Sequence, residues 1–192
     1  MFMNDILNFL KMILKHITNF NIKYYMIIII DSIDRVGKTT LATKLAEALN
    51  AKIYKHCVKN ADYGVMKDDC ETQAMFALIN LANLFKDDII IFDRFHLSNT
   101  VYGQIERNYD TVSSFKNFEK IDSALAELDD TYLIMVNPID IDRSSAEHGK
   151  DLKPYYAKFC GLFEFSKIKN KYSTNYLGID DLVETLKQKI KR

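Results

Sequence analysis

The most informative stretch of the chain is Ile27–Thr40, which reads IIIIDSIDRVGKTT. Its isoleucine run is β-branched and apolar, long enough for a buried strand and too short for a membrane span. Residues Ser32–Thr39 then fit the phosphate-loop spacing G-x-x-x-x-G-K-[ST], with Ser32 in place of the first glycine. Residues Thr40–Leu49 place a leucine at every fourth position among good helix formers, which predicts an amphipathic helix. Strand, loop and helix therefore follow one another in the order that phosphate binding requires.

The residue types in this loop suit a bound phosphate. Gly37 lets the backbone approach closely, and the loop and helix N–H groups present partial positive charge. Lys38 is placed to reach the β- and γ-phosphates of a nucleotide, and the Thr39 hydroxyl to ligate Mg²⁺. A lysine that merely caps a helix start is the alternative interpretation. Ser32 is a departure from the motif, because serine adopts a positive φ less readily than glycine.

The composition favours one soluble domain and excludes several classes of partner. The 192 residues are enough for a substantial core, and 48% apolar with 27% charged residues is ordinary for a globular chain. The 26 basic and 26 acidic side chains cancel, so no general attraction to nucleic acid or anionic membranes is expected. The 3 cysteines lack C-x-x-C spacing, which favours reduced thiols in a cytoplasmic protein over a disulfide framework or zinc knuckle.

Residues 1–25 form an amphipathic extension with an apolar stripe at helical spacing. Lys11 and Lys15 interrupt this stretch, so stable insertion into a membrane is not expected. One interpretation is an interfacial or partner-binding helix. The other is that Met26, directly before the isoleucine run, is the true start and the extension is dispensable. A single domain is expected over residues 26–192.

Apolar runs alternate with helical patterns along the rest of the chain. The predicted strands are Lys52–Cys57, Asp88–Asp93, Thr131–Val136 and Tyr172–Leu177, and the predicted helices are Asp69–Phe85, Phe95–Arg107, Val112–Leu128, Leu152–Lys169 and Ile179–Lys191. Lys59–Lys67 and Ile139–Asp151 are polar segments. This alternation predicts an α/β protein with three layers, α/β/α, around a parallel sheet of about five strands. Ligands bind beyond the carboxyl ends of such strands, which places functional residues within Asp31–Thr39, Asp93–His96 and Asn137–Lys150.

A second group of reactive residues follows the predicted strand Asp88–Asp93. Asp93 is placed to meet a Mg²⁺ shell or to orient an attacking oxygen. Arg94 can form a bidentate fork on a second phosphate. An Asp-Arg pair by itself could simply end a strand, but beside a phosphate loop on a neighbouring strand it favours a binding site.

This combination resembles the thymidylate kinase family of P-loop nucleoside monophosphate kinases. The resemblance rests on Asp34–Thr40, on Asp93–Phe95 and on Val101–Gln104, which is similar to the family's Ala-Tyr-Gln-Gly. The Asp-Arg pair inside the loop is similar to the eukaryotic and viral branch. The resemblance implies the P-loop kinase fold, ATP and Mg²⁺ as cofactors, a small nucleotide acceptor and a homodimer.

The resemblance also implies roles for individual residues. Asp34 would bind the 3′-hydroxyl of the acceptor deoxyribose, Arg35 would neutralise the transferring phosphate, and Arg94 would hold the acceptor phosphate. Thr39 and Asp93 would hold the metal. A short lid near residues 140–151 would cover the site, unless it is only a solvated loop. The residues expected to bind ATP are Asp34, Arg35, Val36, Gly37, Lys38, Thr39, Thr40, Arg143 and Lys150.

The acceptor side departs from the family pattern. Lys55 stands where the family usually has an arginine motif, and it offers a point charge without the guanidinium fork. Phe76 could stack on a base, although apolar residues at helical spacing usually pack in the core. The remaining candidates for acceptor contact are His96, which lies close to Arg94 in the sequence, together with Asn99 and Tyr102.

The sequence therefore predicts ATP- and Mg²⁺-dependent phosphoryl transfer to a deoxynucleoside monophosphate, with dTMP as the first candidate. One alternative is a deoxynucleoside kinase acting on an uncharged nucleoside. Enzymes of that kind typically show Glu-Arg-Ser after the third strand and an acid after the second, where this chain has Asp93–Phe95 and Lys55–Cys57. A non-catalytic nucleotide-binding regulator is the second alternative, and it would have no use for Arg94 as a clamp on a second phosphate.

Overall fold

A computed structural model of the protein describes residues 26–55, 68–84 and 89–190. The amphipathic extension, the predicted loop Lys59–Lys67 and the end of the second predicted strand at His56 and Cys57 lie outside these residues. No helix within the described ranges is long and apolar enough to cross a membrane.

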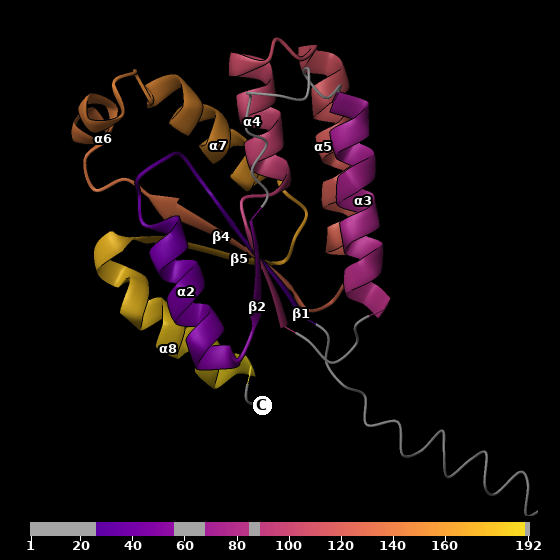
Figure 1. Ribbon diagram of the computed structural model, residues 1–192, viewed down its shortest axis with the longest axis vertical. Coiled ribbons are helices and arrows are strands. Elements are labelled where there is room, and N and C mark those ends of the chain that lie inside the picture. Colours follow the sequence, from indigo (N-terminus) through magenta and orange to yellow (C-terminus); the bar gives the residue numbers. More distant parts are fainter. Residues whose placement is uncertain (1–25, 56–67, 85–88, 191–192) are drawn as a thin grey trace, which may run out of the picture.

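Five parallel strands form one sheet in the order β2-β3-β1-β4-β5 (Figure 1). Their bounds are Met26–Asp31 for β1, Lys52–Lys55 for β2, Ile89–Asp93 for β3, Thr131–Asn137 for β4 and Asn170–Asn175 for β5. The central strand β1 pairs with β3 on one side and β4 on the other. All residues of β1 are buried, which explains a continuous apolar run in place of alternating apolar and polar residues.

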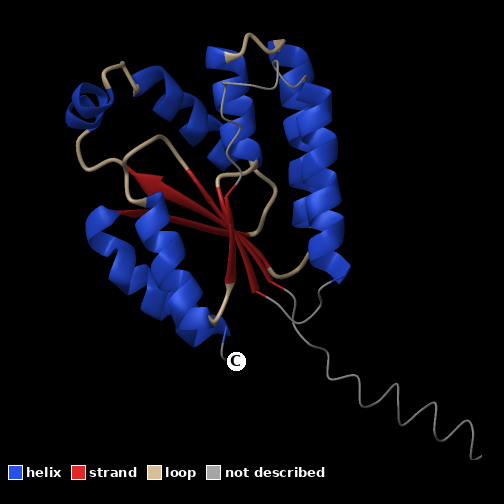
Figure 2. Cartoon of the chain, in the orientation of Figure 1, coloured by secondary structure: helices blue, strands red, loops and turns tan. Residues whose placement is uncertain are grey.

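Helices cover both faces of this sheet, as the sequence predicts (Figure 2). On one face α2 (Lys38–Leu49) packs against α8 (Ile179–Ile190). The other face carries α3 (Asp68–Leu84), α4 (His96–Glu106), α5 (Thr111–Ala126) and α7 (Lys153–Phe165). A further helix, α6 (Ile141–His148), lies against α7, and a single 3-10 turn, η1 (Tyr176–Gly178), joins β5 to α8. The three-layer α/β/α architecture is confirmed.

The polar segment after β4 contains a helix, which the sequence analysis treated only as a lid or a solvated loop. The Asp140 carboxylate begins α6 by accepting from the backbone N–H groups of Asp142 at 2.9 Å and Arg143 at 3.1 Å. Gly149 ends the helix with a φ of 75°. An N-cap aspartate and a left-handed glycine are ordinary start and stop signals, and both were present in the sequence.

The predicted helix Leu152–Lys169 runs too far, and the strand after it begins two residues earlier than expected. Helix α7 ends at Phe165 because Ser166 and Lys167 turn to the Asp122 carboxylate of α5. Ser166 Oγ donates to it at 2.6 Å and the Lys167 backbone N–H at 2.7 Å. The chain then enters β5 at Asn170, and this polar edge strand pairs with β4 through Asn175.

The end of β1 is tied to the start of α4 by a buried carboxylate. Helix α4 has no side-chain cap of its own at Phe95. Asp31 Oδ2 accepts instead from the backbone N–H groups of Phe95 at 3.0 Å and Ser98 at 3.3 Å, and Oδ1 accepts from the Ser98 hydroxyl. Asp31 is fully buried. A residue 64 positions away in the chain therefore satisfies the free N–H groups of the helix.

We predict that Asp31→Ala lowers the free energy of unfolding by about 3 kcal/mol, because it leaves buried donors at the start of α4 unpaired. Urea unfolding measures the loss. Asp180→Ala is the control, since Asp180 forms an exposed ion pair with Lys44 that should contribute less than about 1 kcal/mol. Equal losses in the two variants would show that Asp31 does not hold α4 in place.

Candidate active site

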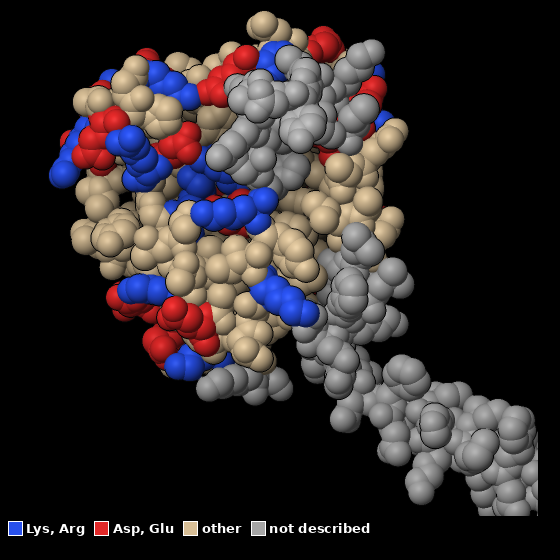
Figure 3. Space-filling model, viewed as in Figure 1, with Lys and Arg blue, Asp and Glu red and all other residues tan. Residues whose placement is uncertain are grey.

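A pocket of about 490 Å³ opens at the carboxyl ends of β1, β2 and β3. It is lined by Asp34, Arg35, Gly37, Lys38, Thr39, Thr40, Lys55, Asp93, Arg94 and Tyr176. Basic side chains gather on the surface between α6 and α2, above the ends of these strands (Figure 3). The structure thus brings together most of the phosphate-binding residues that the sequence predicts.

The loop between β1 and α2 turns through left-handed backbone at two positions. Gly37 has a φ of 99° and Arg35 a φ of 58°. A Cβ at position 37 would lie 2.8 Å from Cδ2 of Tyr176, so glycine is required there by both conformation and space. Ser32 is not among the residues with positive φ, so its departure from the motif carries no backbone strain.

Lys38 is buried at the bottom of this loop. Its ammonium group donates to the backbone carbonyl of Ile33, within the loop itself. Burial, and secondly the charge of Arg94, lower the pKa of Lys38 to about 7. A lysine in this position gains from a nearby anion, because a phosphate would favour its charged form.

Thr39 and Asp93 meet in the lining of the first pocket. Thr39 Oγ1 donates to Asp93 Oδ2 at 2.9 Å, and Lys55 Nζ is 3.8 Å from the same oxygen. The described ranges contain no cluster of three or more His, Cys, Asp or Glu residues that could hold a metal ion. One hydroxyl and one carboxylate are nevertheless a suitable partial set for Mg²⁺, which completes its shell with phosphate oxygens and water.

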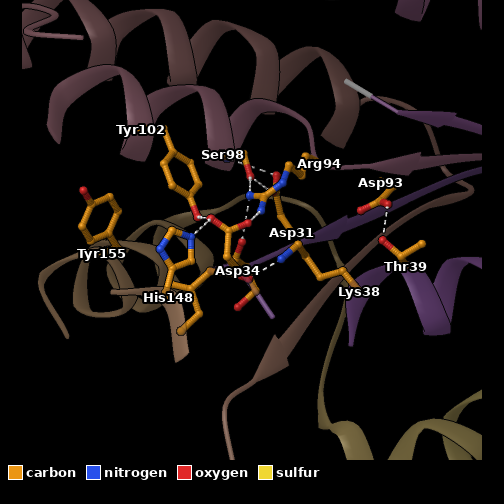
Figure 4. A network of polar contacts seen from close by, with 12 residues as sticks. Asp31, Asp34, Lys38, Thr39, Asp93, Arg94, Ser98, Tyr102, His148 and Tyr155 are labelled. Atoms are coloured by element: carbon orange, nitrogen blue, oxygen red, sulfur yellow. Dashed lines mark hydrogen bonds and ion pairs between the residues drawn. The ribbon is translucent and has the colours of Figure 1, made fainter. Parts of the chain in front are cut away.

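Asp34 is the centre of a network that joins the loop to three other elements (Figure 4). Its Oδ1 forms an ion pair with Arg94, and its Oδ2 accepts from the Tyr102 hydroxyl at 3.1 Å. His148, at the end of α6, lies 3.1 Å from the same Oδ2. Burial by itself would raise the pKa of Asp34, but Arg94 and Lys38 outweigh it and hold that pKa below its usual value. Asp34 is therefore ionised.

Arg94 is held from several sides at the end of β3. Its backbone is left-handed, with a φ of 73°, and its N–H donates to the carbonyl of Ile30 at 3.0 Å. Its guanidinium also contacts the Ser98 hydroxyl at 3.2 Å and lies 5.1 Å from the centre of the Tyr102 ring. A non-glycine residue in this conformation costs free energy, which a built binding site can offset.

A second pocket of about 380 Å³ adjoins the first and shares Arg35 and Tyr176 with it. The rest of its lining comes from Val36 and from the segment around α6, namely Pro138, Ile139, Asp140, Arg143, Ser144 and Glu147. Arg35 Nη1 donates to the backbone carbonyl of Glu147 at 2.6 Å, which links the loop to α6 between the two pockets.

Comparisons with known proteins identify solved structures that resemble the fold of this chain. No protein-family model and no curated protein matches the sequence. The YorR protein of Bacillus subtilis, solved in complex with phosphorylated GDP, has a TM-score of 0.65 and 17% identity, with 86% of this chain and 96% of that chain covered. This chain therefore shares the fold of the YorR protein, a five-stranded parallel sheet with helices on both faces. The NadR protein in complex with NR matches at a TM-score of 0.48 and 16% identity, over 78% of this chain and 43% of that chain.

Several residues expected at the acceptor side lie elsewhere. The side chain of His96, which was expected to contact substrate, is buried 3.2 Å from Asp122, stacks on Phe118 and lines neither pocket. Phe76 packs against the core and lines neither pocket. Asn99 accepts from Arg107 at 3.4 Å and also lies outside both pocket linings.

Arg143 and Lys150, the two basic residues after β4 that were expected to reach ATP, lie in different places. Arg143 lines the second pocket and pairs with Glu147 at 2.8 Å along α6. Lys150 instead pairs with Glu106 of α4, and its ammonium lies 4.5 Å from the centre of the Tyr155 ring. The structure therefore places Lys150 beside α4 and α7, outside the linings of both pockets.

The sequence analysis gave no individual role to Asp31, Tyr176 or His148, although the ranges Asp31–Thr39 and Asn137–Lys150 that it expected to be functional contain Asp31 and His148. Asp31 could have been found, because an acid that ends a buried strand just before a phosphate loop is unusual. Tyr176 and His148 come from segments far along the chain, and no motif marks either of them. Their positions depend on how β5 and α6 approach the loop.

We predict that the free energy of unfolding of the wild type increases, relative to that of Lys38→Met, as the pH rises from 7 to 9. The pKa of Lys38 is about 7 in the folded protein and near 10.5 when unperturbed, so the unfolded chain holds more protons between these values. The gain should reach about 2 kcal/mol. Urea unfolding of both proteins at the two pH values measures it, and parallel pH dependences would show that Lys38 stays charged without ligand.

Proposed function

We propose that the protein transfers the γ-phosphate of ATP, with Mg²⁺, to a deoxynucleoside monophosphate, and that dTMP is the first acceptor to test. The observation that carries this proposal is the position of Arg94, whose guanidinium lines the same pocket as Lys38 and Thr39. A donor nucleotide already uses the lysine and the loop N–H groups. A second cation, directly after the neighbouring strand β3, suits the phosphate of the acceptor.

The pairing of charges supports in-line transfer between two phosphates. Lys38 would hold the β- and γ-phosphates, Arg35 would lie against the transferring group, and Arg94 would hold the acceptor phosphate. Mg²⁺, held by Thr39 and Asp93, would supply charge neutralisation between the phosphates. Phosphoryl transfer gains most of its rate from such positioning and electrostatic stabilisation.

The state of Asp34 favours a charged acceptor over a nucleoside. A nucleoside 5′-hydroxyl needs a general base, whereas the phosphate oxygen of a monophosphate is already ionised. The Arg94 ion pair holds the pKa of Asp34 low, so this carboxylate accepts hydrogen bonds well and accepts protons poorly. Lys55, at the end of β2, adds a cation where a nucleoside kinase would place an acid. Asp34 therefore suits the sugar 3′-hydroxyl of a nucleotide.

The second pocket offers space for the base of the donor. The Tyr176 ring lies at the junction of the two pockets, and Arg143 projects from α6 into the lining of the second. An aromatic ring and a guanidinium are both suitable surfaces for stacking a purine. In this proposal α6 and its flanking turns form the lid over the donor.

ADP release from ATP and Mg²⁺ should be measured against a panel of deoxynucleoside monophosphates, with thymidine as the uncharged acceptor. The phosphorylated GDP in the YorR crystal makes dGMP a useful member of the panel. Turnover with a monophosphate and not with thymidine supports the proposal and names the base. Turnover with thymidine alone moves the assignment to a nucleoside kinase, and ATP binding without any turnover favours a regulator.

We predict that Arg94→Ala raises the KM for the acceptor about 100-fold while the KM for ATP changes less than about threefold, because a charged contact to the acceptor phosphate is lost. The KM of Arg94→Lys for the acceptor should lie between those of the wild type and Arg94→Ala, since lysine keeps the charge but lacks the bidentate guanidinium. Lys44→Ala is the matched control, as Lys44 pairs with Asp180 on the surface. If KM rose equally for the acceptor and for ATP, Arg94 would not be the residue that holds the acceptor phosphate.

A further inference from the structure

Two successive residues at the end of α6 contact two successive residues of the phosphate loop. The Glu147 carbonyl accepts from Arg35, and the His148 ring meets the Asp34 carboxylate (Figure 4). Arg35 and Asp34 are the residues to which the proposed function assigns the transferring phosphate and the acceptor sugar. The end of α6 therefore lies on the loop at the point where donor and acceptor would meet.

The chain that follows His148 is fixed independently of this contact. Gly149 turns the backbone with a φ of 75°, and Lys150 then pairs with Glu106 of α4. Further on, the Leu152 N–H donates to the hydroxyl of Ser145 at 3.0 Å, which closes the turn. These bonds keep α6 in place without the histidine.

The hydrogen bonds of Asp34 leave room for one more donor. An ionised carboxylate has about four lone-pair positions, two on each oxygen. Oδ2 uses both of its positions on Tyr102 and His148, and Oδ1 uses one on Arg94. The carboxylate is thereby oriented by Tyr102 of α4, His148 of α6 and Arg94, which directly follows β3, and Oδ1 retains one position for a ligand hydroxyl.

We propose that His148 is a positioning residue for the acceptor. Its Nε2–H donates to Oδ2 of Asp34 and turns the free lone pair of Oδ1 toward the 3′-hydroxyl of the acceptor sugar. This inference rests on the proposed function, since it assigns a helper to the residue that binds the sugar.

A purely structural role for His148 fits the geometry less well. Its Nδ1 is buried and has no hydrogen-bond partner among the described residues, which is a cost that a stabilising contact would avoid. The neighbouring bonds of Lys150 and Ser145 already hold the turn. The role left for His148 is to orient the Asp34 carboxylate.

The test compares wild type, His148→Ala and His148→Gln with two acceptors that differ only in the sugar 3′-hydroxyl. The acceptor is the best monophosphate of the panel, and its partner is the 3′-deoxy form. For the hydroxylated acceptor, His148→Ala should lose about tenfold in kcat/KM, chiefly through KM, with the KM for ATP unchanged. For the 3′-deoxy acceptor, the variant and the wild type should be equal. His148→Gln retains an N–H donor and should recover most of the loss.

Asp142→Asn is the control for disturbance of α6, because the Asp142 side chain forms an ion pair with Lys153 at the surface, away from both pocket linings. It should match the wild type with both acceptors, and thermal unfolding should show each variant folded. Equal losses with the two acceptors, or no loss with either, would overturn the role of His148 while the wild type remains active. If the wild type phosphorylates no monophosphate, the proposed function itself fails, which is a separate outcome.

Discussion

The buried Asp31 carboxylate is the constraint on which the site depends. It joins the end of the central strand to the first turn of α4, and it also fixes the Ser98 hydroxyl that contacts Arg94. A charge inside the protein is tolerated only where donors surround it, so these bonds cannot be loosened one at a time without cost. These bonds therefore fix the position of Arg94, directly after β3, relative to the phosphate loop.

Local strain and charge balance act together around this point. Arg35, Gly37 and Arg94 all occupy left-handed backbone, and all three line the same pocket. The charge of Arg94 lowers the pKa of Lys38, and the nearby carboxylates of Asp34, Asp31 and Asp93 oppose that effect. Such a cluster of opposed charges in strained backbone is typical of a site built to receive more negative charge than the protein itself supplies.

The positions of His96 and His148 show why sequence motifs were a weaker guide to the residues near the expected acceptor. His96 follows Arg94 by only two residues in sequence, yet the first turn of α4 directs its side chain into the core against Asp122 and Phe118. His148 has no neighbour in any motif, and α6 carries it to Asp34 across 114 positions of sequence. Adjacency along a helix says little about shared direction, because successive side chains point about 100° apart.

The sequence by itself determined the sheet, its parallel strands, the phosphate loop and the residues that follow β1 and β3, since all of these are local patterns of a few residues. Only the tertiary structure decided which charged groups meet. Lys150 pairs with Glu106, Tyr176 lies against Gly37, and His148 contacts Asp34. These contacts depend on how loops from separate strands converge at the edge of the sheet, and no short-range pattern encodes that convergence.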